Sequence, residues 1–85
     1  MFKIEWKEGA IRQIQKLPLL LSKRIYNKID QLKDNPFSKD IKRLKNEESF
    51  RLRIGDYRVI LDLNPKENLI MVLRIGHRKN IYNKW

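Results

Sequence analysis

The order of apolar and polar residues predicts a strand and two helices in the first part of the chain. Apolar and charged residues alternate over residues 2–6, which is the period of a half-buried strand. Apolar residues then recur every three or four positions over residues 10–17, which predicts a short helix that ends at Pro18. The same spacing over residues 21–32 predicts a longer helix, which Asn35-Pro36 stops. The two helices should form a helical hairpin.

Three later segments alternate in the same way as the first strand and predict an antiparallel meander. They cover residues 50–54, 57–63 and 69–75, with turn-forming residues between them. With the first strand they would make one four-stranded sheet covered on one face by the two helices, so the expected fold class is α+β. Residues 37–48 are polar and basic and are expected to form a loop. The helix-facing side of the sheet should carry Phe2, Ile4, Trp6, Phe50, Leu52, Ile54, Val59, Leu61, Leu63, Leu69, Met71, Leu73 and Ile75.

The turns between these strands predict a row of arginines on the outer face of the sheet. Gly55-Asp56 is a two-residue loop suited to a type II′ turn, which places Arg53 opposite Arg58. If the connection of residues 64–68 closes symmetrically, Arg58 also lies opposite Arg74. Like charges directly opposite each other destabilise a sheet, so the row favours an anion-binding surface over a face whose charges are merely solvated.

Two further surfaces allow more than one interpretation. Ile60, Ile70 and Val72 are expected on the outer face of the sheet, either as scattered surface hydrophobics or as a strip that a protein partner covers. The charged positions of the helical hairpin are either solvated or touch a large polyanion at its edge. These positions include Lys16, Lys23, Arg24, Lys28 and Lys33.

Composition narrows the class of partner. The chain has 85 residues, enough for one small domain over residues 1–85 but too few for a deep enclosed cofactor cavity. Twenty Lys and Arg against ten Asp and Glu give a formal net charge of +10, which favours nucleic acid or an acidic protein partner. The absence of cysteine and the single histidine exclude a disulfide scaffold and most zinc sites, so we expect neither metal nor cofactor. The sequence lacks an apolar run of membrane-spanning length and a secretory signal, which predicts a soluble cytoplasmic protein.

Two motifs give the chain a resemblance to a known family. They are Arg51-Leu52-Arg53-Ile54-Gly55-Asp56-Tyr57-Arg58-Val59 and Leu73-Arg74-Ile75-Gly76-His77-Arg78-Lys79-Asn80-Ile81-Tyr82. Together they resemble the RelE branch of the RelE/ParE toxin superfamily, and the order of expected elements agrees over the whole chain. The resemblance implies a compact α+β toxin of a type II toxin–antitoxin pair, which enters the ribosomal A site and cleaves messenger RNA without metal or cofactor. It also implies a cognate acidic, RelB-like antitoxin whose flexible segment wraps and neutralises the toxin.

The arginines suit one of the three chemical tasks of RNA cleavage. Attack of a 2′-OH on the adjacent phosphate needs a base, an acid and cations that stabilise the charge developing on phosphorus. Arginine meets the last need because it stays protonated and presents a planar fork to phosphate oxygens. By resemblance, Arg58 and Arg78 stabilise the phosphate, and Arg51 stands where related toxins carry a catalytic lysine. Residues expected to bind the surrounding RNA are Arg53, Arg74, Lys45 and Lys79.

Tyr82 resembles the C-terminal tyrosine that stacks on or orients the base at the cleavage site. The alternative is an aromatic side chain that packs the terminal segment onto the sheet. The chain departs from the family pattern at Ser49, where the best-known members place a lysine proposed as general base. Glu47 or Glu48 is a candidate carboxylate base, or else a solvated loop residue. His77 could act as acid or base because histidine changes charge near neutral pH, or it has a structural role at a strand end.

Three classes of function are therefore compatible with the sequence. The expected one is a ribosome-dependent endoribonuclease toxin. A ParE-like toxin that inhibits a protein target such as DNA gyrase would need the same fold but not the arginines together with Tyr82. A nucleic-acid-binding module without catalysis would need the positive charge alone.

Overall fold

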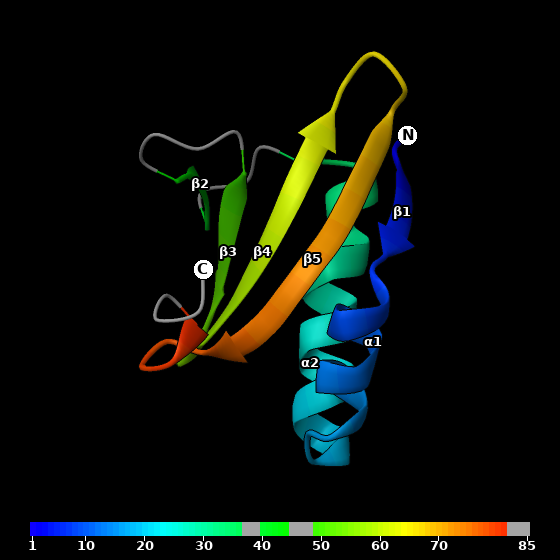
Figure 1. The fold of residues 1–85 in the computed structure, drawn as a ribbon. Coiled ribbons are helices and arrows are strands. Elements are labelled where there is room, and N and C mark those ends of the chain that lie inside the picture. Colours follow the sequence, from blue (N-terminus) through cyan, green and yellow to red (C-terminus); the bar gives the residue numbers. More distant parts are fainter. Residues whose placement is uncertain (37–39, 45–48, 82–85) are drawn as a thin grey trace.

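The computed structural model describes residues 1–36, 40–44 and 49–81, which fold as one sheet with two α-helices against one of its faces (Figure 1). The sheet has five strands in the order β1-β5-β4-β3-β2. The α+β class expected from the sequence is confirmed. In chain order the elements are β1 (Lys3–Trp6), α1 (Glu8–Gln15), α2 (Leu19–Asp30), the short 3₁₀ helix η1 (Gln31–Lys33), β2 (Ile41–Arg43), β3 (Phe50–Ile54), β4 (Tyr57–Asn64) and β5 (Leu69–His77).

The number of strands differs from the expected four. β2 lies in the stretch that was expected to be a loop, and it pairs antiparallel with β3 at the edge of the sheet. Ile41 faces Leu52 in this pairing and packs against the core, so one aliphatic side chain anchors the strand. Three residues are too short a run for alternation to distinguish a strand from a loop in the sequence.

β1 and β5 lie side by side and run parallel, with Ile4 opposite Ile70. Parallel neighbours need a long crossover connection, and the chain between these strands contains both helices. α1 and α2 therefore lie on the same side of the sheet (Figure 1). No helix within the described ranges is long and apolar enough to cross a membrane.

The helices form where the apolar spacing predicts them. Pro18 separates them because proline lacks an N–H and holds its φ near the observed −53°. α2 buries Ile25 and Ile29 completely, and Leu32 of η1 continues the same stripe. These side chains pack against the sheet in one continuous core, which includes Ala10 of α1.

β4 and β5 pair one residue out of the expected register. Asn64 lies opposite Leu69, so the connection has four residues, and Asn68 closes it with a φ of 53°. A slip of one residue turns every side chain of a strand to the opposite face. The predicted core residues Leu69, Met71 and Leu73 are therefore wrong, and Ile70 and Val72 occupy the core in their place.

Near the end of β5, a β-bulge returns the side chains to the faces of the sheet that the sequence predicts. Ile60 pairs with Arg74 and Leu61 pairs with Val72, so β5 contains one extra residue between these pairs. Beyond the bulge Ile75 lies in the core, as predicted.

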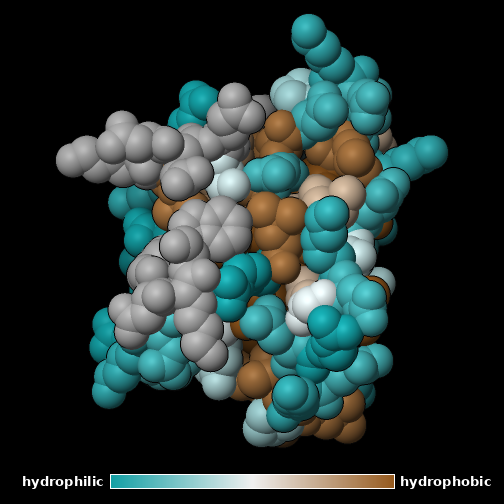
Figure 2. All heavy atoms as spheres, viewed as in Figure 1, coloured by the Kyte–Doolittle hydropathy of each residue, from teal (hydrophilic) through white to brown (hydrophobic). Residues whose placement is uncertain are grey.

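The outer face of the sheet has its own buried positions. Ile60 is fully buried although it is not part of the helix-facing core. Ile81 is also buried, and it packs so closely on Gly76 that a Cβ there would lie 3.1 Å from Ile81 Cδ1. The chain after β5 thus folds back over the end of the sheet. Figure 2 shows hydrophobic side chains in the middle of the visible face, with hydrophilic ones around them.

Candidate functional site: a basic cavity beside the β3–β4 turn

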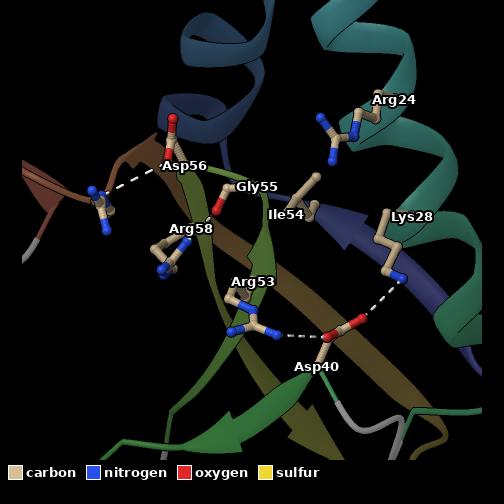
Figure 3. Close-up of a pocket in the computed structure, with 9 residues that line it drawn as sticks. Arg24, Lys28, Asp40, Arg53, Ile54, Gly55, Asp56 and Arg58 are labelled. Carbon is tan, nitrogen blue, oxygen red and sulfur yellow. Dashed lines mark hydrogen bonds and ion pairs between the residues drawn. The ribbon is translucent and has the colours of Figure 1, made fainter.

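A cavity of about 550 Å³ lies between α2 and the β3–β4 turn (Figure 3). Its walls carry five cationic side chains and two carboxylates, so positive charge exceeds negative charge by three. Such an excess in one concave site favours an anionic ligand. The lining residues are Arg24, Lys28, Asp40, Arg53, Ile54, Gly55, Asp56, Arg58 and Arg78.

The β3–β4 turn positions two of these arginines. Gly55 has a φ of +57° and begins the two-residue turn, and Arg53 lies opposite Arg58 as the sequence predicts. Arg58 Nη1 donates hydrogen bonds to the carbonyl oxygens of Gly55 at 2.8 Å and Tyr57 at 2.9 Å. These two bonds hold the guanidinium over the turn and leave its other N–H groups to bind a ligand.

Arg78 reaches the same cavity from the chain that follows β5. Its backbone N–H donates to the carbonyl of Asp56 at 2.8 Å, which ties this segment to the β3–β4 turn. Its Nε also lies 3.8 Å from Asp56 Oδ1. More than half of the Arg78 side chain is exposed, so the Asp56 pair is weak and a stronger anion can replace it.

Asp40 connects the helix wall of the cavity to the sheet wall. One carboxylate oxygen lies 3.0 Å from Lys28 Nζ and the other lies 3.5 Å from Arg53 Nη2 (Figure 3). The backbone N–H of Arg53 also donates to the Asp40 carbonyl at 3.0 Å. The Asp40 carboxylate is therefore an anion that binds cations of both walls, α2 and the sheet.

A second, smaller cavity extends the basic surface towards the sheet edge. It encloses about 120 Å³ and is lined by Asp40, Lys42, Arg51 and Arg53. Because Asp40 and Arg53 line both cavities, the two lie next to each other. Arg51, predicted to be catalytic, lies in this extension beside the main cavity.

The prediction that Arg53, Arg58 and Arg74 form one row is wrong for Arg74. Arg58 lies opposite Gly76, and Arg74 lies opposite Ile60, because the slip and the bulge both change the register of β5. Arg74 does not line the cavity that holds Arg53 and Arg58.

The candidate proton-transfer groups lie elsewhere or outside the described residues. The His77 ring makes an edge contact with Tyr57, with ring centroids 5.5 Å apart, and its Nδ1 accepts a hydrogen bond from the backbone of Lys79 at 3.1 Å. Ser49 Oγ donates to Asp62 Oδ1 at 2.9 Å. The remaining predicted site residues, Lys45, Glu47, Glu48 and Tyr82, lie outside the described residues.

Four charged residues of the cavity are not among the site residues predicted from the sequence. The sequence places Arg24 and Lys28 on the charged face of the helical hairpin, solvated or at the edge of a large polyanion, and it predicts Asp56 only as a turn residue and gives Asp40 no role. The sequence feature that could have indicated Arg24 and Lys28 is their spacing of four residues, which places both on one side of α2. Each also stands directly before a core isoleucine. Among the described side chains, no group of three or more His, Asp and Glu residues could hold a metal ion.

Comparison with known proteins gives matches over nearly the whole chain. Residues 4–82 match the family model described as the ParE toxin of the type II toxin–antitoxin system parDE. A candidate RelE1 toxin of Methanocaldococcus jannaschii is 33% identical over 85 residues, covering 95% of this chain and 94% of that protein.

Two solved structures have the same fold with sequence identity above one quarter. The archaeal RelE–RelB complex from Pyrococcus horikoshii matches with a TM-score of 0.82 and 26% identity, covering 93% of this chain and 97% of that chain. The RelB–RelE antitoxin–toxin complex from Methanococcus jannaschii matches with a TM-score of 0.76 and 27% identity, covering 95% and 98%.

Proposed function

The chain belongs to the RelE/ParE family of type II toxin–antitoxin toxins, and from this premise we propose that it is an endoribonuclease that cleaves messenger RNA on the ribosome. The observation that carries the proposal is the cavity beside the β3–β4 turn, where Arg53, Arg58 and Arg78 converge. A protein that only needed positive charge would not have to gather arginines from two strands and a following turn into one concave site.

The proposed reaction is attack of a ribose 2′-OH on its own 3′-phosphate. The O2′–P bond forms and the P–O5′ bond breaks, which leaves a 2′,3′-cyclic phosphate and a free 5′-OH. The 2′-OH loses its proton to a base, and the leaving O5′ gains one from an acid. Negative charge increases on the phosphoryl oxygens as the transition state forms, so fixed cations there lower the barrier.

Arg58 and Arg78 are the residues proposed to stabilise that charge. Arg58 is held over the turn by two backbone carbonyls, so little reorganisation is needed when the phosphate arrives. Arg78 is tied to the same turn through its backbone. Arg51, in the adjoining cavity, would contact the RNA next to this position, and Arg53 would bind the backbone between them.

His77 contributes less to this proposal than the arginines. Its ring lies against Tyr57, and its Nδ1 is occupied by a backbone N–H. The proposed acceleration therefore rests mainly on charge stabilisation, which is usually the largest single contribution in such sites. Glu47, Glu48 and Tyr82 remain the proposed proton-transfer and base-orienting residues by resemblance to the family.

An antitoxin is the proposed protein partner. The two solved relatives described above are complexes of a toxin with its antitoxin. The net charge of +10 favours an acidic partner, whose carboxylates would compete with RNA for the arginines of the cavity. Inhibition would then be direct, or would come from bulk that keeps the toxin out of the ribosome.

Cleavage mapped on ribosome-bound message tests the proposal. Purified toxin should cut message on a programmed ribosome and leave a 2′,3′-cyclic phosphate, while the same message without ribosomes should remain intact. The matched family model is that of ParE toxins, which favours inhibition of a protein target such as DNA gyrase as the second candidate. Loss of gyrase supercoiling activity with no cut in the message would select that candidate and reject the first.

A further inference from the structure

The cavity carries more positive charge than one scissile phosphate can neutralise. Its cations exceed its carboxylates by three, whereas one phosphodiester carries a single negative charge. Its volume of about 550 Å³ falls within the range of roughly 300–1,000 Å³ that is usual for ligand sites. The scissile phosphate with Arg58 and Arg78 therefore leaves both space and charge on the opposite wall, which α2 provides.

Arg24 and Lys28 form that opposite wall. They are one helical turn apart, so both side chains lie on the same side of α2. Figure 3 shows Arg24 directed toward Gly55 of the β3–β4 turn and Lys28 directed toward Asp40. The Arg24 guanidinium nitrogens lie 3.4 Å from the position of a Cβ on Gly55, the residue whose carbonyl also holds Arg58. Arg24 and Arg58 thus approach the same turn from two elements.

The two cations of α2 differ in their present partners. Lys28 contacts the Asp40 carboxylate, which also contacts Arg53 on the sheet wall. Among the described residues, no carboxylate lies within ion-pair distance of Arg24. Asp40 shows that an oxygen anion fits between the two walls at Lys28. Arg24 instead lies beside Gly55 of the β3–β4 turn.

We propose that Arg24 and Lys28 bind a second RNA phosphate, next to the scissile one, so that the cavity holds two successive phosphates of the backbone. The inference rests on the proposed function for its choice of RNA as ligand. Arg24 is the main contact, and Asp40 limits the affinity of the site because its carboxylate competes for Lys28. Binding two phosphates on facing walls fixes the direction and position of the strand, whereas one phosphate leaves it free to turn.

Uncleavable dinucleotides test the proposal by calorimetry. The probes are 2′-O-methyl dinucleotides with one internal phosphate, and the same compounds with an added 5′- or 3′-terminal phosphate. The wild-type protein should bind one of the two-phosphate probes about tenfold more tightly than the one-phosphate probe, as expected for one charge-assisted contact. Arg24→Gln should remove this gain and leave the affinity for the one-phosphate probe unchanged.

Two further variants separate a specific contact from general charge. Lys23→Gln removes the neighbouring cation, which lines a different cavity with Ile14 and Tyr26, and it should keep the tenfold gain. Asp40→Asn should increase the gain, because it removes the competing carboxylate. Arg24→Lys should keep part of it, which also shows that a variant at this exposed position folds.

Several results would overturn the inference. One is that Arg24→Gln and Lys23→Gln lower the affinity for the two-phosphate probe equally. Another is that Arg24→Gln lowers the affinity for all probes equally, and a third is that it lowers none of them. If Arg24→Gln instead weakened only the antitoxin complex, α2 would be a surface for a protein partner. Binding of the probes does not depend on cleavage, so a wild-type protein that shows the tenfold gain but fails to cut ribosome-bound message would reject the proposed function and keep the α2 site.

Discussion

Gly55 is the residue whose backbone conformation makes the cavity possible. Its φ of +57° lies in the left-handed region, and the turn that it begins positions Arg53 and Arg58. A side chain in this conformation costs about 1–2 kcal/mol. Gly55→Ala should therefore lower the free energy of unfolding by about that amount, measured by chemical denaturation, and should also lower cleavage because the turn carries Arg58.

Gly9 provides the matched control for this prediction. It lies inside α1, and a Cβ there would meet no atom within 4 Å. Gly9→Ala should leave stability unchanged or raise it by about 0.5–1 kcal/mol, since alanine favours the helix. If both alanine variants had the same effect on stability, the proposed role of the Gly55 conformation would be wrong.

The sequence predicted some cavity residues and not others for a physical reason. Arg53 and Arg58 flank a two-residue turn, so local geometry alone brings them together. Arg24 and Asp40 join them only because α2 packs on the sheet and β2 pairs with β3, which no local pattern encodes. Lys45 stays a prediction from the basic sequence of residues 37–48, and Glu47 or Glu48 and Tyr82 stay predictions from resemblance.

At the level of elements, the register of β5 can be tested by replacing each of two neighbouring residues with alanine in separate variants. Ile70 is fully buried in the core, whereas Met71 lies opposite Asp62 and is partly exposed. Ile70→Ala should cost about 2–5 kcal/mol of unfolding free energy. Met71→Ala should cost about 1 kcal/mol. Chemical denaturation of both variants decides the register. The register expected from the sequence buries Met71 in place of Ile70, so it requires the larger loss of unfolding free energy for Met71→Ala.

The two hairpins of the sheet differ in how well the sequence predicts their register. The β3–β4 hairpin was predicted correctly because a two-residue Gly-X loop allows few geometries. The β4–β5 connection was assigned five residues, but Asn68 adopts a positive φ and closes it after four. The resulting one-residue slip moved Leu69 and Met71 from their expected face, the slip and the bulge together moved Arg74 away from Arg58, and beyond the bulge Ile75 faces the core as expected.

At the level of the whole molecule, RNA binding should depend strongly on salt. If three to five phosphates of single-stranded RNA are neutralised, the log–log slope of affinity against salt should be roughly −2 to −3.5, at about 0.7 per contact. Arg53→Ala should reduce the magnitude of this slope by less than about one unit and weaken binding to all sequences alike. Affinity that does not change between low and physiological salt would contradict binding to a polyanion.

The proposed antitoxin can be tested in cells. A short acidic protein encoded beside this toxin should bind it and relieve the growth arrest that the toxin alone causes, because its carboxylates would occupy the basic cavity. Co-purification and growth curves check the two expectations separately. A neighbour that neither binds nor relieves arrest would show that the assigned pairing is wrong.

Single-turnover cleavage of message on a programmed ribosome tests the central claim, that the arginine cavity is the catalytic centre. Arg58→Ala and Arg78→Ala should each lower the cleavage rate by about 10²–10³, as expected when a preorganised charge-stabilising donor is lost. Their affinity for the ribosome should change far less. Arg58→Lys should recover only part of the rate, since a point charge cannot reproduce a bidentate fork.

The matched control is Lys66→Ala, in the exposed turn between β4 and β5, which should cleave at the wild-type rate. If the cavity is the catalytic centre, Arg58→Ala and Arg78→Ala lose cleavage rate while still binding the ribosome, and Lys66→Ala does not. If Arg58→Ala and Arg78→Ala both cleave at nearly the wild-type rate, the cavity is a docking surface and its assignment as the catalytic centre is wrong.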